Sequence, residues 1–100
     1  MAKFAVIGLG KFGFNVATTL YEKGAEVIAI DNNQKLVDEI SGRVSVAIKL
    51  NSTDEKALKQ NHIQDTDAVI LAIGNNIEVS VLTSVILKKI GVNNIHAKVD

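Results

Sequence analysis

The sequence contains no cysteine, which excludes disulfide bonds and thiolate chemistry and fits a reducing, cytoplasmic compartment. Net charge is also absent, because eleven basic residues balance eleven acidic ones without clustering. We therefore expect no binding to nucleic acid, which requires a basic surface. A long apolar run is missing too: the longest helical apolar segment, residues 77–90, is interrupted by serine, threonine, glutamate and lysine and is not expected to span a bilayer.

What the sequence does contain is enough apolar material for one small core. Its 100 residues are 47% hydrophobic, and no linker, low-complexity tract or long internal repeat divides them. We expect a single globular domain over residues 1–100.

Strand and helix patterns alternate along the whole chain. Strands are expected at residues 3–9, 26–30, 44–50, 68–73 and 94–99. Helices are expected at residues 11–23, 33–40 and 77–90, and the capping-box spacing of Ser52 and Glu55 predicts a short helix that ends near residue 61. Right-handed crossovers then give an α/β fold, a Rossmann-like doubly wound parallel sheet with strand order 3-2-1-4-5. A sixth strand, usual in dinucleotide-binding sheets, is expected beyond Asp100 in a longer protein.

A glycine-rich turn, G-x-G-x-x-G at residues 8–13, joins the first strand to the first helix. Gly8 permits the tight turn, Gly10 lets bare main chain approach a diphosphate, and Gly13 lets the helix pack closely on the sheet. The opening amides of that helix have no intrahelical partner and favour an anion. Asp31 follows the second strand eighteen residues after Gly13, close to the spacing of about 20 expected of a ribose-binding carboxylate. Together these residues predict a nucleotide site.

Polar and small residues at the other strand ends belong to the same edge of the sheet. They are Asn32 and Asn33, then Asn51, Ser52 and Thr53, then Ile73, Gly74 and Asn75, and finally Lys98, Val99 and Asp100. Asn51 lies where an adenine edge is expected. Asn75 or Asn76 is expected to cap the helix at 77–90, and Asn33 and Asn76 are better explained as helix caps than as ligand contacts.

The nucleotide is only partly specified by the residues themselves. Asp31 has no arginine close to it in the sequence, so it would repel a 2′-phosphate and favour NAD(H) over NADP(H). An adenosine ribose also belongs to ADP and ATP, and Asp31 does not separate these ligands from NAD(H). Lys11, inside the glycine turn, is either a point charge for a terminal phosphate or an exposed lysine at a helix start.

The residues from Phe4 to Gly13, the turn at 31–33, the N-S-T-D run at 51–54, the A-I-G run at 72–74 and the closing Ala97-Lys98 pair resemble a known family. It is the N-terminal nucleotide-binding domain of potassium-transport regulators, called RCK, KTN or TrkA-N. The chain looks most like the cytosolic subunits of bacterial Ktr and Trk uptake systems. The resemblance covers the whole sequence.

This resemblance implies a role for each candidate site residue. Gly10, Lys11, Phe12 and Gly13 would face the phosphates, Asp31 would hold the ribose, Asn51 and Ser52 would flank the adenine, Ile73, Gly74 and Asn75 would line the pocket floor, and Lys98 would lie near the phosphates or the second ribose. Lys11 stands where many relatives have arginine, and lysine lacks the bidentate fork of arginine.

The resemblance further implies a cytoplasmic regulatory subunit, peripheral to the inner face of the membrane. Such subunits assemble as dimers and rings, up to octamers, on an integral-membrane potassium transporter. Bound NAD(H), ADP or ATP would gate the transporter by favouring one ring conformation over another. Two apolar stripes on the helix at 77–90 are compatible with a broad core face or with a subunit contact. The first stripe is Val79, Leu82, Ile86 and Ile90, and the second is Ile77, Val81, Val85 and Lys88.

Catalytic and metal-binding residues are not expected. His62 lies in a polar loop and His96 lies within the last strand, and neither has the setting of a proton-transfer group. The alternative function is the cofactor-binding half of an NAD-dependent oxidoreductase, which would need such a group near the nicotinamide. A scaffold that retains the glycine turn without using it is a third interpretation.

Overall fold

A computed structural model describes residues 1–99, and Asp100, the last of the predicted strand-end residues, lies outside the described residues. Five parallel strands form one sheet in the order β3-β2-β1-β4-β5. They are β1 (Lys3–Ile7), β2 (Glu26–Asp31), β3 (Val46–Lys49), β4 (Ala68–Gly74) and β5 (Ile95–Val99). The helices are α1 (Lys11–Glu22), α2 (Gln34–Ile40), α3 (Glu55–Gln60), the 3-10 turn η1 (Ile63–Asp65) and α4 (Ile77–Lys89). The predicted fold class and strand order are confirmed.

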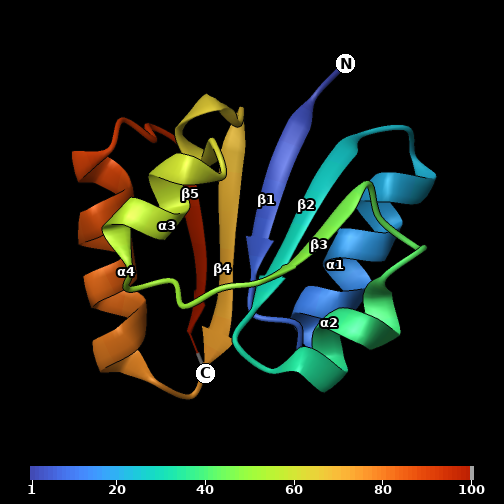
Figure 1. Ribbon diagram of the computed structural model, residues 1–100, viewed down its shortest axis with the longest axis horizontal. Helices are drawn as coiled ribbons and strands as arrows, with labels where there is room; N and C mark the ends of the chain where they lie inside the picture. The colour runs from blue at the N-terminus through green and yellow to red at the C-terminus, as the bar shows by residue number, and fades with distance from the viewer. Residues whose placement is uncertain (100) are drawn as a thin grey trace.

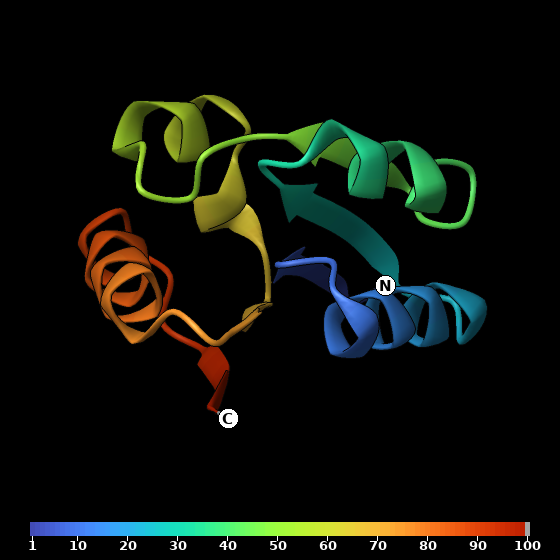
Figure 2. The same ribbon diagram turned by 90° about the horizontal axis from the view of Figure 1, so that it is seen from below.

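Helices cover both faces of the sheet. Helices α1 and α2 lie on one face, and α3 and α4 lie on the other (Figures 1 and 2). All five strands run toward the same edge of the sheet, which is the lower edge in Figure 1. Figure 2 shows the molecule from that edge. Because both faces are buried, the central strands are apolar at successive positions rather than at alternate ones.

Successive side chains of one strand therefore enter two different cores. On β2, Ile28 and Ile30 pack toward α3 and α4, whereas Val27 and Ala29 pack toward α1 and α2. Leu87 of α4 lies in the first core and is fully buried. Burial of this kind on both sides holds the strand ends, and the loops that follow them, in fixed positions.

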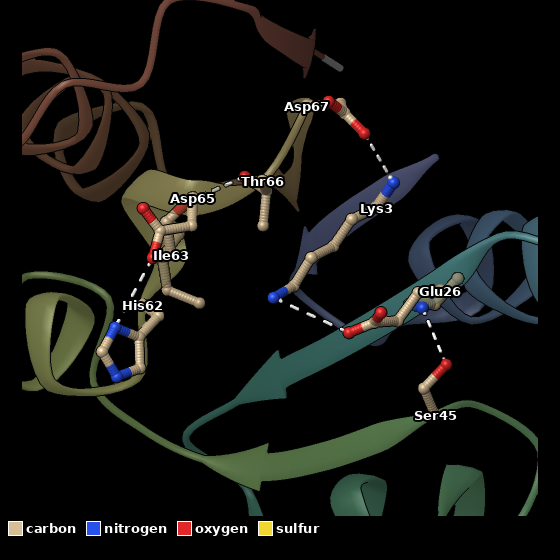
Figure 3. Close-up of polar contacts among 9 residues, drawn as sticks. Lys3, Glu26, Ser45, His62, Ile63, Asp65, Thr66 and Asp67 are labelled. Atoms are coloured by element: carbon tan, nitrogen blue, oxygen red, sulfur yellow. Dashed lines mark hydrogen bonds and ion pairs between the residues drawn. The ribbon is translucent and has the colours of Figure 1, made fainter. Parts of the chain in front are cut away.

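The amino-terminal edge of the sheet is tied together by polar contacts (Figure 3). The main-chain amide of Lys3 donates to Asp67 Oδ2 at 2.7 Å, and the Lys3 ammonium group lies 3.7 Å from Glu26 Oε2. Next to them, the amide of Val27 donates to Ser45 Oγ at 2.9 Å. These contacts join β1, β2 and the segments before β3 and β4, and they lie at the edge opposite the glycine turn.

Two of the predicted helix caps are confirmed. Asn33 Oδ1 accepts from the amide of Lys35 at 2.9 Å, and Asn76 Oδ1 accepts from the amide of Val79 at 3.1 Å. Both asparagines thereby satisfy an amide that has no partner within its helix.

The capping box predicted at residues 52–55 is wrong. Asp54, not Ser52, caps α3, because its Oδ1 accepts from the amide of Ala57 at 3.1 Å. The side chain of Ser52 is instead buried between the cleft and α4, where its Oγ lies 2.9 Å from Thr83 Oγ1. The turn η1 was not predicted either; His62 leads into it with a left-handed backbone (φ 59°) and an exposed ring.

Helix α4 contacts the core through a narrower face than its apolar content suggests. Thr83 and Leu87 are its buried residues. Leu82, from the first predicted stripe, is exposed, and so are Ile77, Val81 and Val85 of the second. The second stripe is therefore not part of a broad core face. Among residues 1–99, no helix has both the length and the apolar character needed to cross a bilayer.

Candidate nucleotide-binding site

A cleft of about 530 Å³ opens where β1 and β4 end, at the point where the strand order reverses. In open parallel sheets this is the place where ligands bind. Most of the predicted site residues line it: Gly8, Gly10, Asp31, Asn32, Asn51, Ser52, Thr53, Ile73 and Asn75. Four different strand-to-helix connections thus meet in one cleft.

Several lining residues were not among the predicted site residues. They are Ile7, Leu9, Leu50, Ala72, Asn76 and Val79. Ile7, Leu9, Leu50 and Ala72 lie at or next to the strand ends, and that position was the only available signal. Together with Val79 of α4 they give the cleft apolar walls.

The first and third glycines of the turn are required by the protein itself. Gly8 has a φ of +100°, and a Cβ there would lie 2.6 Å from the carbonyl oxygen of Ala72. A Cβ on Gly13 would overlap the carbonyl oxygen of Gly8. Any side chain at either position would push α1 away from the ends of β1 and β4.

Gly10 is different, because neither the backbone nor the packing requires glycine there. Its φ is −67°, an ordinary value, and an added Cβ would meet no atom within 4 Å other than those of its own chain neighbours. The residue is exposed and lines the cleft. A side chain would extend from the main chain into open space, where a ligand would otherwise approach the backbone.

Helix α1 begins at this open glycine without a cap. In the part of the chain that the structure describes, α2, α3 and α4 each begin at an Asn or Asp side chain that accepts from a first-turn amide. Gly10, at the start of α1, offers no side chain, and the first turn carries no acidic residue. The opening amides of α1 therefore present donors and the positive end of the helix dipole to an external anion.

Asp31 lies beside this turn and is already bonded to the main chain. Its Oδ2 accepts from the amide of Leu9 at 2.8 Å, and its Oδ1 accepts from the amide of Asn33 at 2.9 Å. A carboxylate has about four acceptor sites. Asp31 can hold the turn and still accept hydrogen bonds from a pair of ribose hydroxyls.

Asn51 lies on the wall formed by the loop after β3. Its Oδ1 accepts from the amide of Thr53 at 2.9 Å and from the Thr53 hydroxyl at 2.7 Å. Because a main-chain amide can only donate, it is the oxygen of the Asn51 side chain that faces Thr53. The side-chain nitrogen is left to donate to a ligand, and the ring nitrogens of adenine are suitable acceptors.

The remaining predicted residues lie outside the cleft lining. They are Lys11, Phe12, Gly13, Asn33, Gly74 and Lys98. Lys11 and Phe12 are exposed in the first turn of α1, and the Lys98 ammonium lies 5.1 Å from the centre of the Phe12 ring. This contact links the end of β5 to the start of α1, beside the uncapped amides. Gly74 and Lys98 line a second hollow of about 310 Å³ between α4 and β5.

The residues present fit an adenine nucleotide by their chemistry. Uncapped amides suit a diphosphate, a carboxylate suits a ribose, and an amide donor with apolar walls suits a purine. Asp31 is the only ionisable side chain in the described lining of the cleft. Within residues 1–99, no cluster of three or more His, Cys, Asp or Glu side chains could hold a metal ion.

The strand order, the glycine turn and the cleft at the switch point define a Rossmann-like α/β domain. Within that class the chain belongs to the TrkA-N domain family, whose model matches residues 4–100. The resemblance that the sequence suggested is thereby confirmed.

Individual relatives agree with this assignment. The chain is 46% identical over 96 residues to Ktr system potassium uptake protein C of Bacillus subtilis, which covers 96% of this chain and 43% of that protein. It is 41% identical over 96 residues to Ktr system potassium uptake protein A of Vibrio alginolyticus, covering 96% of this chain and 44% of that protein. The chain thus spans less than half the length of these curated relatives.

Solved structures of low sequence identity share the fold. The NAD(P)-binding domain of an exopolyphosphatase-related protein from Archaeoglobus fulgidus has a TM-score of 0.80 at 21% identity, over 99% of this chain and 72% of that chain. The TrkA-N domain of an Escherichia coli inner membrane protein has a TM-score of 0.71 at 17% identity, over 95% of this chain and 86% of that chain. A 3-hydroxyacyl-CoA dehydrogenase from A. fulgidus also has a TM-score of 0.71, at 18% identity, over 100% of this chain and 34% of that chain.

Proposed function

We propose that this protein is a non-enzymatic regulator of potassium uptake that binds an adenine nucleotide in the cleft between β1 and β4. The observation that carries the nucleotide site is the uncapped start of α1 behind the open flank of Gly10, next to Asp31. The potassium role is supported by the family and by relatives that are named as Ktr potassium uptake proteins.

The ligand we propose is NAD(H), ADP or ATP rather than NADP(H). Asp31 would repel a 2′-phosphate on the ribose that it binds. The single arginine of the sequence, Arg43, does not line the cleft; its guanidinium lies 3.9 Å from Glu22 Oε2 and 5.2 Å from the centre of the Phe14 ring. No arginine is thus available within the lining to neutralise a 2′-phosphate.

An NAD-dependent oxidoreductase is the second candidate, favoured by the fold shared with a dehydrogenase. It requires a proton-transfer group next to the nicotinamide. In the described lining of the cleft the only ionisable side chain is Asp31, which is engaged by two main-chain amides. His62 and His96 are both exposed and lie outside that lining. A binding role therefore accounts for the site better than catalysis does.

We further propose that the protein works as a homo-oligomer, from dimer to octameric ring, in contact with an integral-membrane potassium transporter. In this role the protein would work in the cytoplasm, at the inner face of the membrane. The exposed apolar side chains of α4, Ile77, Val81 and Val85, are the proposed subunit contact. Nucleotides regulate such an assembly only if they bind two of its conformations with different affinity.

Calorimetric titration of the purified protein with NADH, NAD⁺, ADP, ATP and NADPH tests the nucleotide site. Binding of the first four, with NADPH weakest, supports the proposal, and no binding of any of them at millimolar concentration contradicts it. Incubation of the protein and NAD⁺ with candidate alcohols tests the oxidoreductase, because reduction of the cofactor would be seen at 340 nm.

A cellular assay tests the potassium role separately. Deletion of the gene should slow potassium uptake from dilute medium, and the unaltered gene should restore it. A copy carrying Asp31→Ala should restore uptake poorly if nucleotide binding controls the transporter. Unchanged uptake in the deletion strain would contradict the potassium role.

A further inference from the structure

A buried pair of hydroxyl groups connects the cleft to the middle of α4. Ser52 Oγ and Thr83 Oγ1 lie 2.9 Å apart. Ser52 lines the cleft from the loop after β3 and is 8% exposed, whereas Thr83 belongs to α4 and has no exposed surface. Among residues 1–99, neither hydroxyl makes another hydrogen bond.

Burial decides which of the two hydroxyls donates. Each carries one hydrogen and can also accept. If Ser52 donated, the hydrogen of Thr83 would be enclosed in the core without an acceptor, which is an unfavourable arrangement. If Thr83 donates, its hydrogen is satisfied, and the hydrogen of Ser52 is left at the wall of the cleft. The distance alone allows either direction, and this argument from burial assigns the donor role to Thr83.

From this geometry we propose that Thr83 is a positioning residue for nucleotide binding. By donating to Ser52 Oγ, it turns the Ser52 hydroxyl hydrogen toward the cleft, where that group donates to an acceptor atom on the adenosine end of the ligand. Thr83 itself does not line the cleft. The inference rests on the proposed function, because it assumes that an adenine nucleotide occupies the cleft.

The test compares affinities for ADP and NADH, measured by calorimetry, in a double-mutant cycle. Thr83→Val keeps the shape of the side chain and removes the hydroxyl, and Ser52→Ala removes the donor that Thr83 positions. Loss of one oriented hydrogen bond is expected to weaken binding about three- to tenfold in either single variant. The double variant should bind no more weakly than Ser52→Ala alone, because Thr83 acts through Ser52. Thr83→Ser, which retains the donor, should restore affinity to near that of the unaltered protein.

Thr18→Val is the matched control. Thr18 is also a buried helical threonine, but its hydroxyl donates within α1, to the carbonyl of Phe14 at 3.0 Å. This variant undergoes the same chemical change as Thr83→Val, so any general cost of removing a buried hydroxyl appears in its thermal unfolding. Its affinity for ADP and NADH should be unchanged.

The outcomes separate this inference from the proposed function. If Thr83→Val folds and binds both ligands as tightly as the unaltered protein, or if its effect adds fully to that of Ser52→Ala, Thr83 does not act through Ser52. If the unaltered protein binds neither ligand, the proposed function fails and this inference fails with it. NMR of the ligand-free protein adds an independent readout: the hydroxyl proton of Thr83 should exchange slowly with solvent and that of Ser52 quickly, and the reverse order would overturn the assigned direction.

Discussion

Asp31 holds the main-chain amide of Leu9 at 2.8 Å, across 22 positions of the chain. This bond fastens the end of β2 to the middle of the glycine turn. The second carboxylate oxygen of Asp31 accepts from the amide of Asn33, so the same side chain also fixes the loop that leads into α2. Asp31 thus organises the protein side of the cleft as well as being the residue that we propose binds the ribose.

Asp31→Ala should therefore lower both stability and affinity. Loss of two hydrogen bonds to main-chain amides should reduce the free energy of unfolding by about 1–3 kcal/mol, measured by urea denaturation. Affinity for NADH, ADP and ATP should fall together, since all three carry an adenosine ribose. Asp38→Ala is the control, because Asp38 is exposed on α2 and its side chain accepts a hydrogen bond only from Gln34 Nε2 within the described residues. If Asp31→Ala bound the nucleotides as tightly as the unaltered protein, Asp31 would not be a ligand-binding residue.

Gly10 and Gly13 should respond differently to a single methyl group. Gly13→Ala should strongly destabilise the protein, because its Cβ would overlap the carbonyl oxygen of Gly8. Gly10→Ala should change the free energy of unfolding by no more than about 1 kcal/mol, because the entropy that alanine removes from the unfolded chain opposes its weaker preference for the N-cap position. Nucleotide affinity of Gly10→Ala should nevertheless fall, because the methyl group stands between the ligand and the uncapped amides. Thermal unfolding and calorimetry of both variants measure these effects, and unchanged affinity in Gly10→Ala would show that no ligand approaches the backbone there.

The fold was predictable because its signals are local and agree with one another. The apolar run at 68–73, the glycine turn at 8–13 and the helix caps Asn33 and Asn76 each indicate the same element in the sequence and in the structure. Parallel strands with short crossovers then permit few arrangements, so the order 3-2-1-4-5 followed.

The errors arose where a long-range contact outweighed a local pattern. Ser52 and Glu55 have the spacing of a capping box, but the Ser52 hydroxyl forms a buried hydrogen bond with Thr83, which lies 31 positions away. Asp54 then takes over the cap. Likewise, the apolar residues of α4 did not reveal which of them face solvent, because that depends on how the helix is rotated against β4 and β5. A periodic pattern gives the stripes of a helix but not the neighbour that each stripe meets.

NADH should bind more tightly than NADPH by tenfold or more. A 2′-phosphate would lie against the carboxylate of Asp31, and Arg43, the one arginine of the sequence, is engaged with Glu22 and Phe14. Two like charges about 4 Å apart repel each other by on the order of 1–4 kcal/mol at a partly exposed site. Separate titrations of the protein with each cofactor, each followed by the fluorescence of the reduced nicotinamide, give the two dissociation constants and hence their ratio. Asp31→Asn should bring the affinities for NADH and NADPH closer together. Equal affinity for both cofactors in the unaltered protein would contradict the assignment of Asp31 to the ribose.

The apolar stripe on α4 should control self-association. Ile77, Val81 and Val85 are 64%, 57% and 58% exposed, so Val81→Glu and Val85→Glu remove no packing from this chain's own core and should change the free energy of unfolding by less than about 0.5 kcal/mol. In sedimentation velocity, each variant should shift the protein toward the monomer, because a carboxylate would have to be buried in the contact. Tyr21→Glu is the control, since Tyr21 is 42% exposed on α1, on the other face of the sheet. If Val81→Glu associates as the unaltered protein does, the stripe is not the subunit contact, and association must use another surface.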